Sequence, residues 1–291
     1  MLPAPEIEDG DKLFLRAGAR RSGQPDRFLS YVLHPGAAQA PLTVFFAHGG
    51  GGNKHQWRHQ WRHLAGRGLR LVAWDALGHG QSTQPRHWPS FAADVQVADF
   101  LEVLERFGGP RNLLVSHSLG ARLTLAALQQ LQARGALAQR TPVAAAVLLG
   151  PPAVSLRIPR ALALPSFVLE LVRKSISARF NGLAWHPDAD PALVKHEKAL
   201  TKRNRLYTMQ ALLRQAPGLD PALLRQLNVP VEIVAGDSDG VTPVTQAQEL
   251  QALLPDARLH VIERCGHQLM LERPEKVNAI IDAAVLRCGI A

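Results

Sequence analysis

NLLVSHSLGARL, residues 112–123, places an apolar run before two serines and a helix-forming run after them. A serine hydroxyl is a weak nucleophile until a nearby base removes its proton, so a catalytic serine must be exposed at the end of a strand. A sharp strand-to-helix turn exposes the serine when small residues stand two places before and two places after it. Ser116 and Gly120 hold those places around Ser118, so the pattern predicts Ser118 as a nucleophile. The alternative is an ordinary strand-to-helix connection.

Two neighbours of Ser118 qualify this prediction. Ser116 stands where glycine is usual in such a turn. It is the weaker candidate nucleophile, because the residue two places before it, Leu114, is bulky. His117 is interpreted as a turn residue and not as the catalytic base, since adjacent side chains point in different directions.

The acid and the base of a catalytic triad have candidates near the end of the chain. In VEIVAGDSDGVTP, residues 231–243, Asp239 follows an apolar run, with Asp237 as the second choice for the acid. In VIERCGHQLMLERP, His267 follows another strand-like run and a glycine. The order Ser118, Asp239, His267 is one in which serine hydrolase triads occur. The pattern therefore predicts a Ser-His-Asp triad, although each residue taken alone also fits a turn or surface role.

A glycine-rich loop predicts donors for a developing oxyanion. FFAHGGGGN, residues 45–53, ends the first strong strand with Gly49–Gly52, whose backbone can turn N–H groups toward an anion. A second donor is the N–H of Leu119, at the start of a helix. The GK[ST] ending of a phosphate-binding loop is absent. The loop WDALGHGQS, residues 74–82, is interpreted as a structural turn beside the site.

Short apolar runs alternate with helical patterns in two parts of the chain. Unalternating apolar strands separated by helices indicate parallel strands buried on both faces, so we expect a doubly wound, mostly parallel α/β sheet. The expected strands lie at 42–49, 69–80, 112–118, 143–152, 229–239 and 258–267, and the expected helices at 53–67, 90–107, 119–134, 243–254 and 274–286. This pattern divides the chain into a first core part at 1–152, a helical lid at 153–228 and a second core part at 229–291.

In the segment 153–228, the alternation of strand and helix patterns stops. SFVLELVRKSISARF, residues 166–180, has apolar residues at helical spacing and no strand pattern nearby, which predicts a helix of the lid. Apolar lid residues either line an acyl pocket or pack within the lid; these are Phe167, Leu171 and Phe180.

The lid also holds much of the excess positive charge. It has twelve Lys or Arg against five Asp or Glu, while the whole chain has a formal net charge of +9. Four basic residues are spaced to form one stripe on a helix: Lys195, Lys198, Lys202 and Arg205. A solvated outer face is the favoured interpretation, and weak contact with an anionic membrane surface is the alternative. No recognition motif accompanies the charge, so we expect no specific nucleic-acid partner.

Composition limits the class of protein. Forty-six per cent hydrophobic and 20% charged residues over 291 positions are typical of a globular chain. The beginning of the chain lacks the basic and apolar regions of a secretory leader, and no run approaches the ~18 apolar residues of a membrane span, so we expect a soluble cytoplasmic protein. The two cysteines, Cys265 and Cys288, are too few for a disulfide framework. No spacing predicts a metal or cofactor site, and nothing predicts the oligomeric state.

Taken together, these motifs resemble the α/β-hydrolase superfamily, of the kind with a helical cap inserted after the sixth strand. The resemblance covers about residues 28–290 and is carried by HGGGGN, DALGHGQS, SHSLG, GDSDGVTP and CGHQLMLERP. It implies the α/β-hydrolase fold and an oxyanion hole formed by Gly50 and Leu119, with Gly51 as a further contributor. It also implies catalysis without a cofactor.

The resemblance also narrows the chemistry. A serine nucleophile excludes the members of the superfamily that attack with an aspartate. A small-molecule acyl substrate is therefore expected, with a carboxylic ester as the commonest choice and an acyl-enzyme as the intermediate. A thioesterase, an amidase, a hydrolase of carbon–carbon bonds and a non-catalytic binding protein of the same fold are the alternatives.

Overall fold

A computed structural model describes residues 7, 10–15, 26–135, 142–156, 158, 164–202 and 204–290. Its centre is an eight-stranded sheet in the order β1-β2-β4-β3-β5-β6-β7-β8. The strands are β1 Asp11–Leu15, β2 Arg27–His34, β3 Thr43–Ala47, β4 Arg70–Trp74, β5 Asn112–His117, β6 Val143–Leu149, β7 Val231–Gly236 and β8 Ala257–Ile262. From β3 onward all pairings are parallel, whereas β1 and β2 are antiparallel to their neighbours. The doubly wound, mostly parallel α/β sheet expected from the sequence is confirmed.

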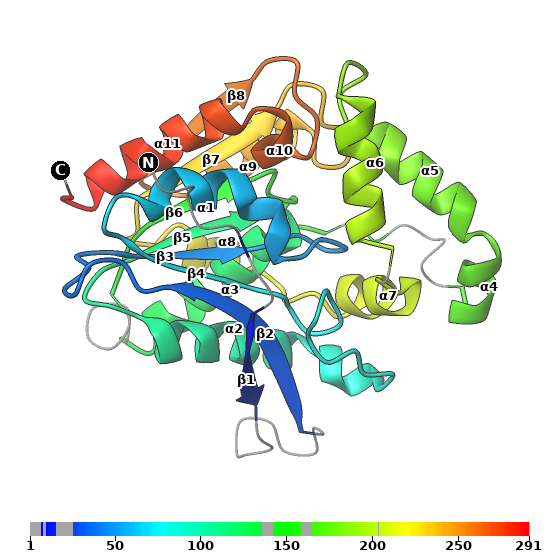
Figure 1. The fold of residues 1–291 in the computed structure, drawn as a ribbon, viewed down its shortest axis with the longest axis horizontal. Coiled ribbons are helices and arrows are strands. Elements are labelled where there is room, and N and C mark those ends of the chain that lie inside the picture. Colours follow the sequence, from blue (N-terminus) through cyan, green and yellow to red (C-terminus); the bar gives the residue numbers. More distant parts are fainter. Residues whose placement is uncertain are drawn as a thin grey trace.

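Helices cover both faces of the sheet (Figure 1). The helices of the two layers are α1 Arg58–Ala65, α2 Ala93–Phe107, α3 Leu119–Ala133, α8 Pro221–Leu224, α9 Val244–Gln251, α10 Leu269–Glu272 and α11 Pro274–Arg287. Residues of α2, α3, α8 and α9 pack in one hydrophobic cluster, and those of α1, α10 and α11 pack in the other. In β5, Leu114 belongs to the first cluster, while Leu113 and Val115 belong to the second. Alternate side chains of one strand therefore fill two cores, which explains why the central strands are apolar throughout.

The strands β1 and β2 were not expected from the sequence. In the described part of the chain, β1 is the edge strand and pairs only with β2, which lies between β1 and β4. Antiparallel strands with one face toward solvent carry no continuous apolar run. Phe14 of β1, for example, is 66% exposed. The apolar criterion that found the central strands therefore could not find these two.

The sequence between β6 and β7 forms a group of helices, which lies at one end of the sheet (Figure 1). They are α4 Ser166–Leu171, α5 Arg173–Ala184, α6 Pro191–Leu200 and α7 Leu206–Arg214, followed by α8. From here on, the segment from the start of α4 to the end of α7, residues 166–214, is called the lid. The single helix expected at 166–180 is instead two, α4 and α5, with Val172 between them. Leu171 and Phe180 are 82% and 41% exposed, so neither is packed in a core; the side chain of Phe167 lies outside the described part.

The basic stripe predicted for one helix is broken in the structure. Lys195 and Lys198 are exposed on α6, but α6 ends at Leu200. The chain turns there because the Thr201 hydroxyl donates to the Glu197 carbonyl, and Asn204 is bonded to the glycine loop instead of continuing the helix. The stripe prediction is wrong for its second half: Lys202 and Arg205 follow α6, and Arg205 precedes α7.

Two further expectations concern the surroundings of the protein. Among the described residues, no helix is both long and apolar enough to span a bilayer. Cys265 and Cys288 are buried and unpaired with one another. Burial raises the pKa of both thiols, to about 12 for Cys265 and about 11 for Cys288, so both are inert at neutral pH.

We predict that Phe46→Ala destabilises the fold by about 3–5 kcal/mol, because it leaves a cavity in a packed core. Phe46 is fully buried in β3, and its ring centroid lies 5.4 Å from that of Trp57. Urea unfolding followed by tryptophan fluorescence measures the loss. The control, Phe14→Ala on the exposed face of β1, is expected to cost less than about 1 kcal/mol; equal losses in the two variants would contradict the assignment of the core.

Candidate active site

The turn between β5 and α3 holds Ser118 in a backbone conformation that only glycine adopts readily. Its φ is 50° and its ψ is −117°, a region that costs a non-glycine residue on the order of 1–3 kcal/mol. The Ser118 N–H donates to the Leu149 carbonyl at 2.9 Å. A Cβ on Gly120 would lie 2.6 Å from two carbonyl oxygens of the β3 end, so no larger residue fits there. The turn therefore presents Ser118, which is only half-buried, at the carboxyl edge of the sheet.

Serine at position 116 fits this turn although glycine is usual there. Ser116 pairs in register with Ala47 of β3 and is fully buried. Among the described residues other than glycine, a positive φ occurs only at Ser118 and Arg264, so position 116 does not need the freedom of glycine. A side chain that is small enough to be buried against β3 is sufficient.

Asp239 and His267 form a buried hydrogen-bonded pair. The distance from Asp239 Oδ2 to His267 Nδ1 is 2.7 Å, and the two residues are 4% and 2% exposed. Asp239 Oδ1 also accepts the N–H groups of Val241 and Thr242, both at 2.8 Å, and its Oδ2 accepts the Thr242 hydroxyl at 2.8 Å. The carboxylate is thus held in one orientation, with its hydrogen bonds directed at the imidazole ring and the following turn.

These contacts keep Asp239 ionised. Burial raises its pKa, but the hydrogen bond from His267, the charge of that ring and the donors of Thr242 together lower the pKa below its ordinary value. An ionised carboxylate next to Nδ1 keeps the proton on that nitrogen, which leaves Nε2 of His267 as the basic nitrogen.

The second-choice acid, Asp237, lies elsewhere. It is exposed, and its oxygens accept the N–H groups of Arg264 and Cys265 at 2.9 and 3.1 Å. Its role is to shape the loop that precedes His267. The geometry therefore favours Asp239 over Asp237 as the partner of the histidine.

His267 lies beside the turn that presents Ser118. Its ring centroid is 4.6 Å from that of His117, and His117 Nε2 donates to the His267 carbonyl at 2.9 Å. A Cβ on Gly150, where φ is 52°, would lie 3.1 Å from His267 Nδ1. Gly150 directly follows Leu149, the acceptor of the Ser118 N–H. Ser118 and His267 therefore both lie next to the end of β6.

His117 supports the base instead of replacing it. It is buried, and burial together with the neighbouring His267 lowers its pKa well below the ordinary value, so it stays neutral. Its Nε2 proton is used in the bond to the His267 carbonyl, and within the described part of the chain its Nδ1 has no hydrogen-bond partner. The interpretation of His117 as a turn residue agrees with this geometry.

The amides of the loop Gly49–Gly52, called here the glycine loop, differ in whether they are hydrogen-bonded within the protein. The Gly51 N–H donates to His79 Nε2 at 2.9 Å, away from Ser118, which argues against Gly51 as an oxyanion donor. For the N–H groups of Gly50 and Leu119, the described residues provide no acceptor. The two predicted donors are therefore available.

The glycine loop packs directly against the nucleophile turn. A Cβ on Gly49 would lie 2.6 Å from His117 Nδ1 and 3.1 Å from the Ser118 Cβ. One on Gly50 would lie 3.5 Å from the Leu119 side chain. The approach at Gly49 therefore requires glycine, whereas Gly50 lies in ordinary van der Waals contact with the Leu119 side chain, next to Ser118.

The lid touches both the glycine loop and the base. The His267 N–H donates to the carbonyl of Ala184, the last residue of α5, at 2.8 Å. The Asn204 side-chain amide donates to the Gly51 carbonyl. A Cβ on Gly50 would lie 3.0 Å from Cε of Met209, a residue of α7. Lid and site therefore form one packed unit.

Sequence reasoning missed three of these residues. Thr242 lies within the quoted GDSDGVTP motif, and its spacing of three from Asp239 is typical of a side chain that closes a turn. Gly150 follows an apolar strand, but nothing in the sequence marks it as the residue that accommodates His267. Met209 could not be found, because only the folded lid brings it to the glycine loop.

Comparison with known proteins finds a family model and relatives that this chain resembles. A family model described as "Alpha/beta hydrolase family" matches residues 44–280. Protein ABHD8 of Bos taurus is 27% identical over 258 residues, covering 86% of this chain and 57% of that protein. The 2-hydroxy-6-oxo-6-(2'-aminophenyl)hexa-2,4-dienoic acid hydrolase of Metapseudomonas resinovorans is 27% identical and covers 85% of each chain.

The fold also matches solved structures. An esterase from Exiguobacterium antarcticum superimposes with a TM-score of 0.76 at 20% identity, covering 89% of this chain and 96% of that chain. The present chain spans little more than half the length of the ABHD8 proteins that it matches. Similarity to ABHD8 therefore concerns only the part of that protein that aligns.

We predict that Asp239 contributes to the acid sensitivity of the fold. Because its pKa is lower in the folded than in the unfolded chain, the ionised form stabilises the fold above the unfolded pKa of about 4. That contribution is lost as the pH falls through the folded pKa. The free energy of unfolding of the wild type should therefore decrease from about pH 5 downward more steeply than that of Asp239→Asn. Urea titrations between about pH 3 and pH 7 measure both slopes, and parallel curves would contradict the prediction.

Proposed function

This chain belongs to the alpha/beta hydrolase family, and from that premise we propose that it is a serine hydrolase that cleaves carboxylic esters. The observation that carries the proposal is the buried pair of Asp239 and His267 beside a serine in a strained turn. The neighbouring N–H groups of Gly50 and Leu119, which have no acceptor in the described part of the chain, add to its support.

The reaction would begin at Ser118. His267 Nε2 removes the hydroxyl proton while the oxygen attacks the acyl carbon, and Asp239 stabilises the imidazolium that forms. The same proton then passes to the leaving alcohol, which leaves an acyl-enzyme on Ser118. Water, activated by His267, cleaves that ester and restores the serine.

The tetrahedral oxyanion would be held by the N–H groups of Gly50 and Leu119. Leu119 is the first residue of α3, so the helix dipole adds to the stabilisation of negative charge. In another serine hydrolase, the loss of one oxyanion donor costs about 2.7–4 kcal/mol of transition-state stabilisation. A chain whose two donors flank the nucleophile is suited to acyl transfer.

Met209 of α7 lies against the glycine loop, so it would border the acyl group. Met209 contributes an unbranched thioether side chain at this position, and such side chains adapt to ligands of different shape. The surface opposite Gly50 is therefore apolar, which favours an uncharged acyl group over an acidic one.

Esters are favoured over the other acyl substrates by similarity to the Exiguobacterium esterase, which shares the fold. The name of the Metapseudomonas relative gives a dienoic acid as its substrate and so favours a second candidate, hydrolysis of a carbon–carbon bond. A panel of p-nitrophenyl esters, acyl thioesters, anilides and a 2-hydroxy-6-oxo-dienoate compares the candidates directly. The highest kcat/KM in the panel identifies the substrate class.

We predict that Ser118→Ala abolishes turnover of p-nitrophenyl esters while its Tm stays close to that of the wild type. The hydroxyl is the proposed nucleophile, and the described part of the chain records no hydrogen bond from it that the fold would lose. Initial rates and differential scanning fluorimetry measure the two effects.

The matched control is Ser116→Ala, two positions earlier and within β5. Its hydroxyl is buried and lacks a partner among the described residues, so its removal should leave turnover intact. Activity retained by Ser118→Ala, or lost equally in both variants, would exclude Ser118 as the nucleophile. Absence of turnover and of fluorophosphonate labelling in the wild type would favour a binding protein.

A further inference from the structure

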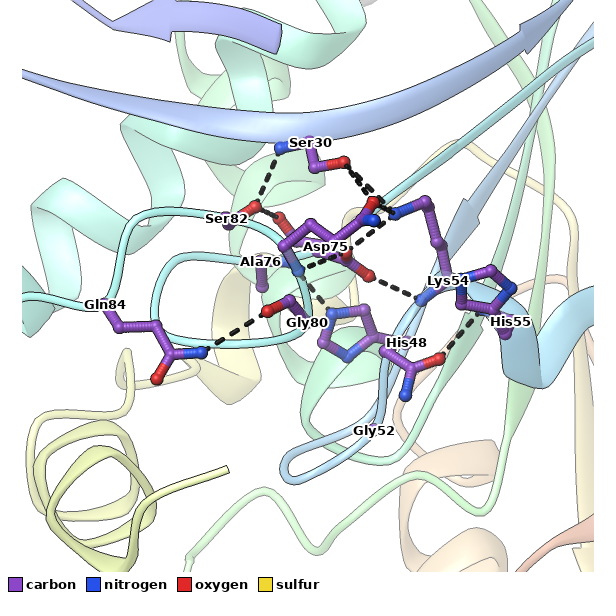
Figure 2. A network of polar contacts seen from close by, with 12 residues as sticks. Ser30, His48, Gly52, Lys54, His55, Asp75, Ala76, Gly80, Ser82 and Gln84 are labelled. Atoms are coloured by element: carbon purple, nitrogen blue, oxygen red, sulfur yellow. Dashed lines mark hydrogen bonds and ion pairs between the residues drawn. The ribbon is translucent and has the colours of Figure 1, made fainter. Parts of the chain in front are cut away.

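A lysine ammonium is enclosed in the protein just beyond the glycine loop. Lys54 is fully buried, although a charged side chain is costly to bury unless it is paired and hydrogen-bonded. Its Nζ donates to Asp75 Oδ2 at 2.9 Å, to Gln81 Oε1 at 2.8 Å and to Ser30 Oγ at 3.1 Å. All three protons of the ammonium are therefore used (Figure 2).

Asp75 binds Lys54 at two points. Besides the contact to Nζ, its Oδ1 accepts the backbone N–H of Lys54 at 2.8 Å. Oδ2 also accepts the Gln81 N–H at 2.9 Å. The side chain lies so close to the turn that follows β4 that a Cβ on Gly80 would be 2.2 Å from Oδ2. This double contact fixes the backbone two residues past the glycine loop against the end of β4 (Figure 2).

The same turn after β4 holds the glycine loop at two more points. The Ala76 N–H donates to His48 Nε2 at 2.9 Å, and His48 Nδ1 donates to the Gly49 carbonyl at 2.7 Å. The Gly51 N–H donates to His79 Nε2 at 2.9 Å. Burial lowers the pKa of His79 to about 3, so this ring is neutral and can accept that proton.

These bonds decide which amides of the loop are used within the protein. Gly51 is bonded to His79, Gly52 is bonded to the Gly49 carbonyl, and the residues on both sides of the loop are bound to the turn after β4, so the N–H of Gly50 is left without an acceptor among the described residues. A shift of the Lys54 backbone would move the loop as a whole, because four glycines in sequence have no side chains to hold their own conformation. An oxyanion hole tolerates little displacement, since its donors must lie within hydrogen-bond distance of the developing charge.

We propose that Lys54, through its ion pair with Asp75, is a positioning residue that sets the oxyanion hole of this enzyme. This inference rests on the proposed function, because it assigns a task to the loop that would hold the oxyanion. Lys54 itself touches no substrate. It acts by holding the glycine loop in the conformation in which Gly50 serves as donor.

A merely structural ion pair would have a different signature. Loss of such a pair lowers the amount of folded enzyme and the Tm, but each molecule that remains folded turns over normally. A displaced oxyanion donor weakens binding of the transition state more than binding of the substrate, so kcat falls while KM changes little. The two signatures can be separated by counting competent sites.

The test compares Lys54→Met with Arg27→Met. Arg27 forms another buried ion pair, with Asp99 at 2.8 Å, which joins β2 to α2 and leaves a carboxylate without this partner when it is removed. End-point labelling with a fluorophosphonate counts competent sites. Rates with p-nitrophenyl butyrate give kcat per site, and the Ki of an alkyl trifluoromethyl ketone, which binds as a tetrahedral adduct, reports the oxyanion hole.

Lys54→Met is expected to lose about 10- to 100-fold in kcat per labelled site, with KM nearly unchanged and Ki raised by the same factor as kcat/KM falls. Arg27→Met should lower Tm but keep the wild-type kcat per site and Ki. Wild-type values in Lys54→Met, or an equal loss of kcat in Arg27→Met, would overturn the inference.

A second variant keeps the test decisive if Lys54→Met does not fold. Asp75→Asn keeps the shape of the side chain and removes the charge that pairs with Lys54, so it should also lower kcat per site and raise Ki. A folded Asp75→Asn variant with unchanged values would overturn the inference. A wild type that neither hydrolyses the ester nor reacts with the fluorophosphonate would instead overturn the proposed function, which keeps the two failures distinct.

Discussion

The backbone of Ser118 is the constraint on which the site depends. A positive φ at a residue with a side chain persists only where its surroundings hold it, and here β5, α3 and the end of β6 all do so. The sharp turn lifts the hydroxyl out of the sheet, and the missing side chain of Gly120 lets α3 approach the end of β3. The turn thus brings Ser118 and the start of α3 against the glycine loop.

Parallel strands supply the remaining geometry. Because the carboxyl ends of β3 to β8 lie at one edge of the sheet, residues from distant parts of the chain meet there without long connecting segments. Asp239 follows β7 and His267 follows β8, and a 2.7 Å hydrogen bond joins them. The lid adds contacts from above, through Ala184 to the base and through Asn204 to the glycine loop. A change in the lid is therefore expected to shift His267 and the glycine loop.

Much of this arrangement is visible in the sequence, for reasons that particular residues illustrate. Ser118, Asp239 and His267 are predictable because each follows an apolar strand, and short loops after neighbouring parallel strands lie at the same edge of the sheet. The contacts of Thr242 and Lys54 are not, since they depend on distances between segments that only the folded chain defines. The antiparallel strands β1 and β2 were missed for another reason, because they carry a weak apolar pattern. The break between the lid helices α4 and α5 was also missed. The local sequence pattern predicts helices and strands well, whereas it does not predict which side chains from distant segments form hydrogen bonds or ion pairs with one another.

The central claim is that the imidazole of His267, oriented by Asp239, activates the hydroxyl of Ser118. Peptide mass spectrometry of the protein after reaction with a fluorophosphonate tests this most directly, because only an activated hydroxyl reacts and the modified residue is identified by its fragments. The account predicts a single phosphonylated residue, Ser118, and loss of the modification in His267→Ala. An unmodified Ser118, or equal modification in His267→Ala, would contradict it.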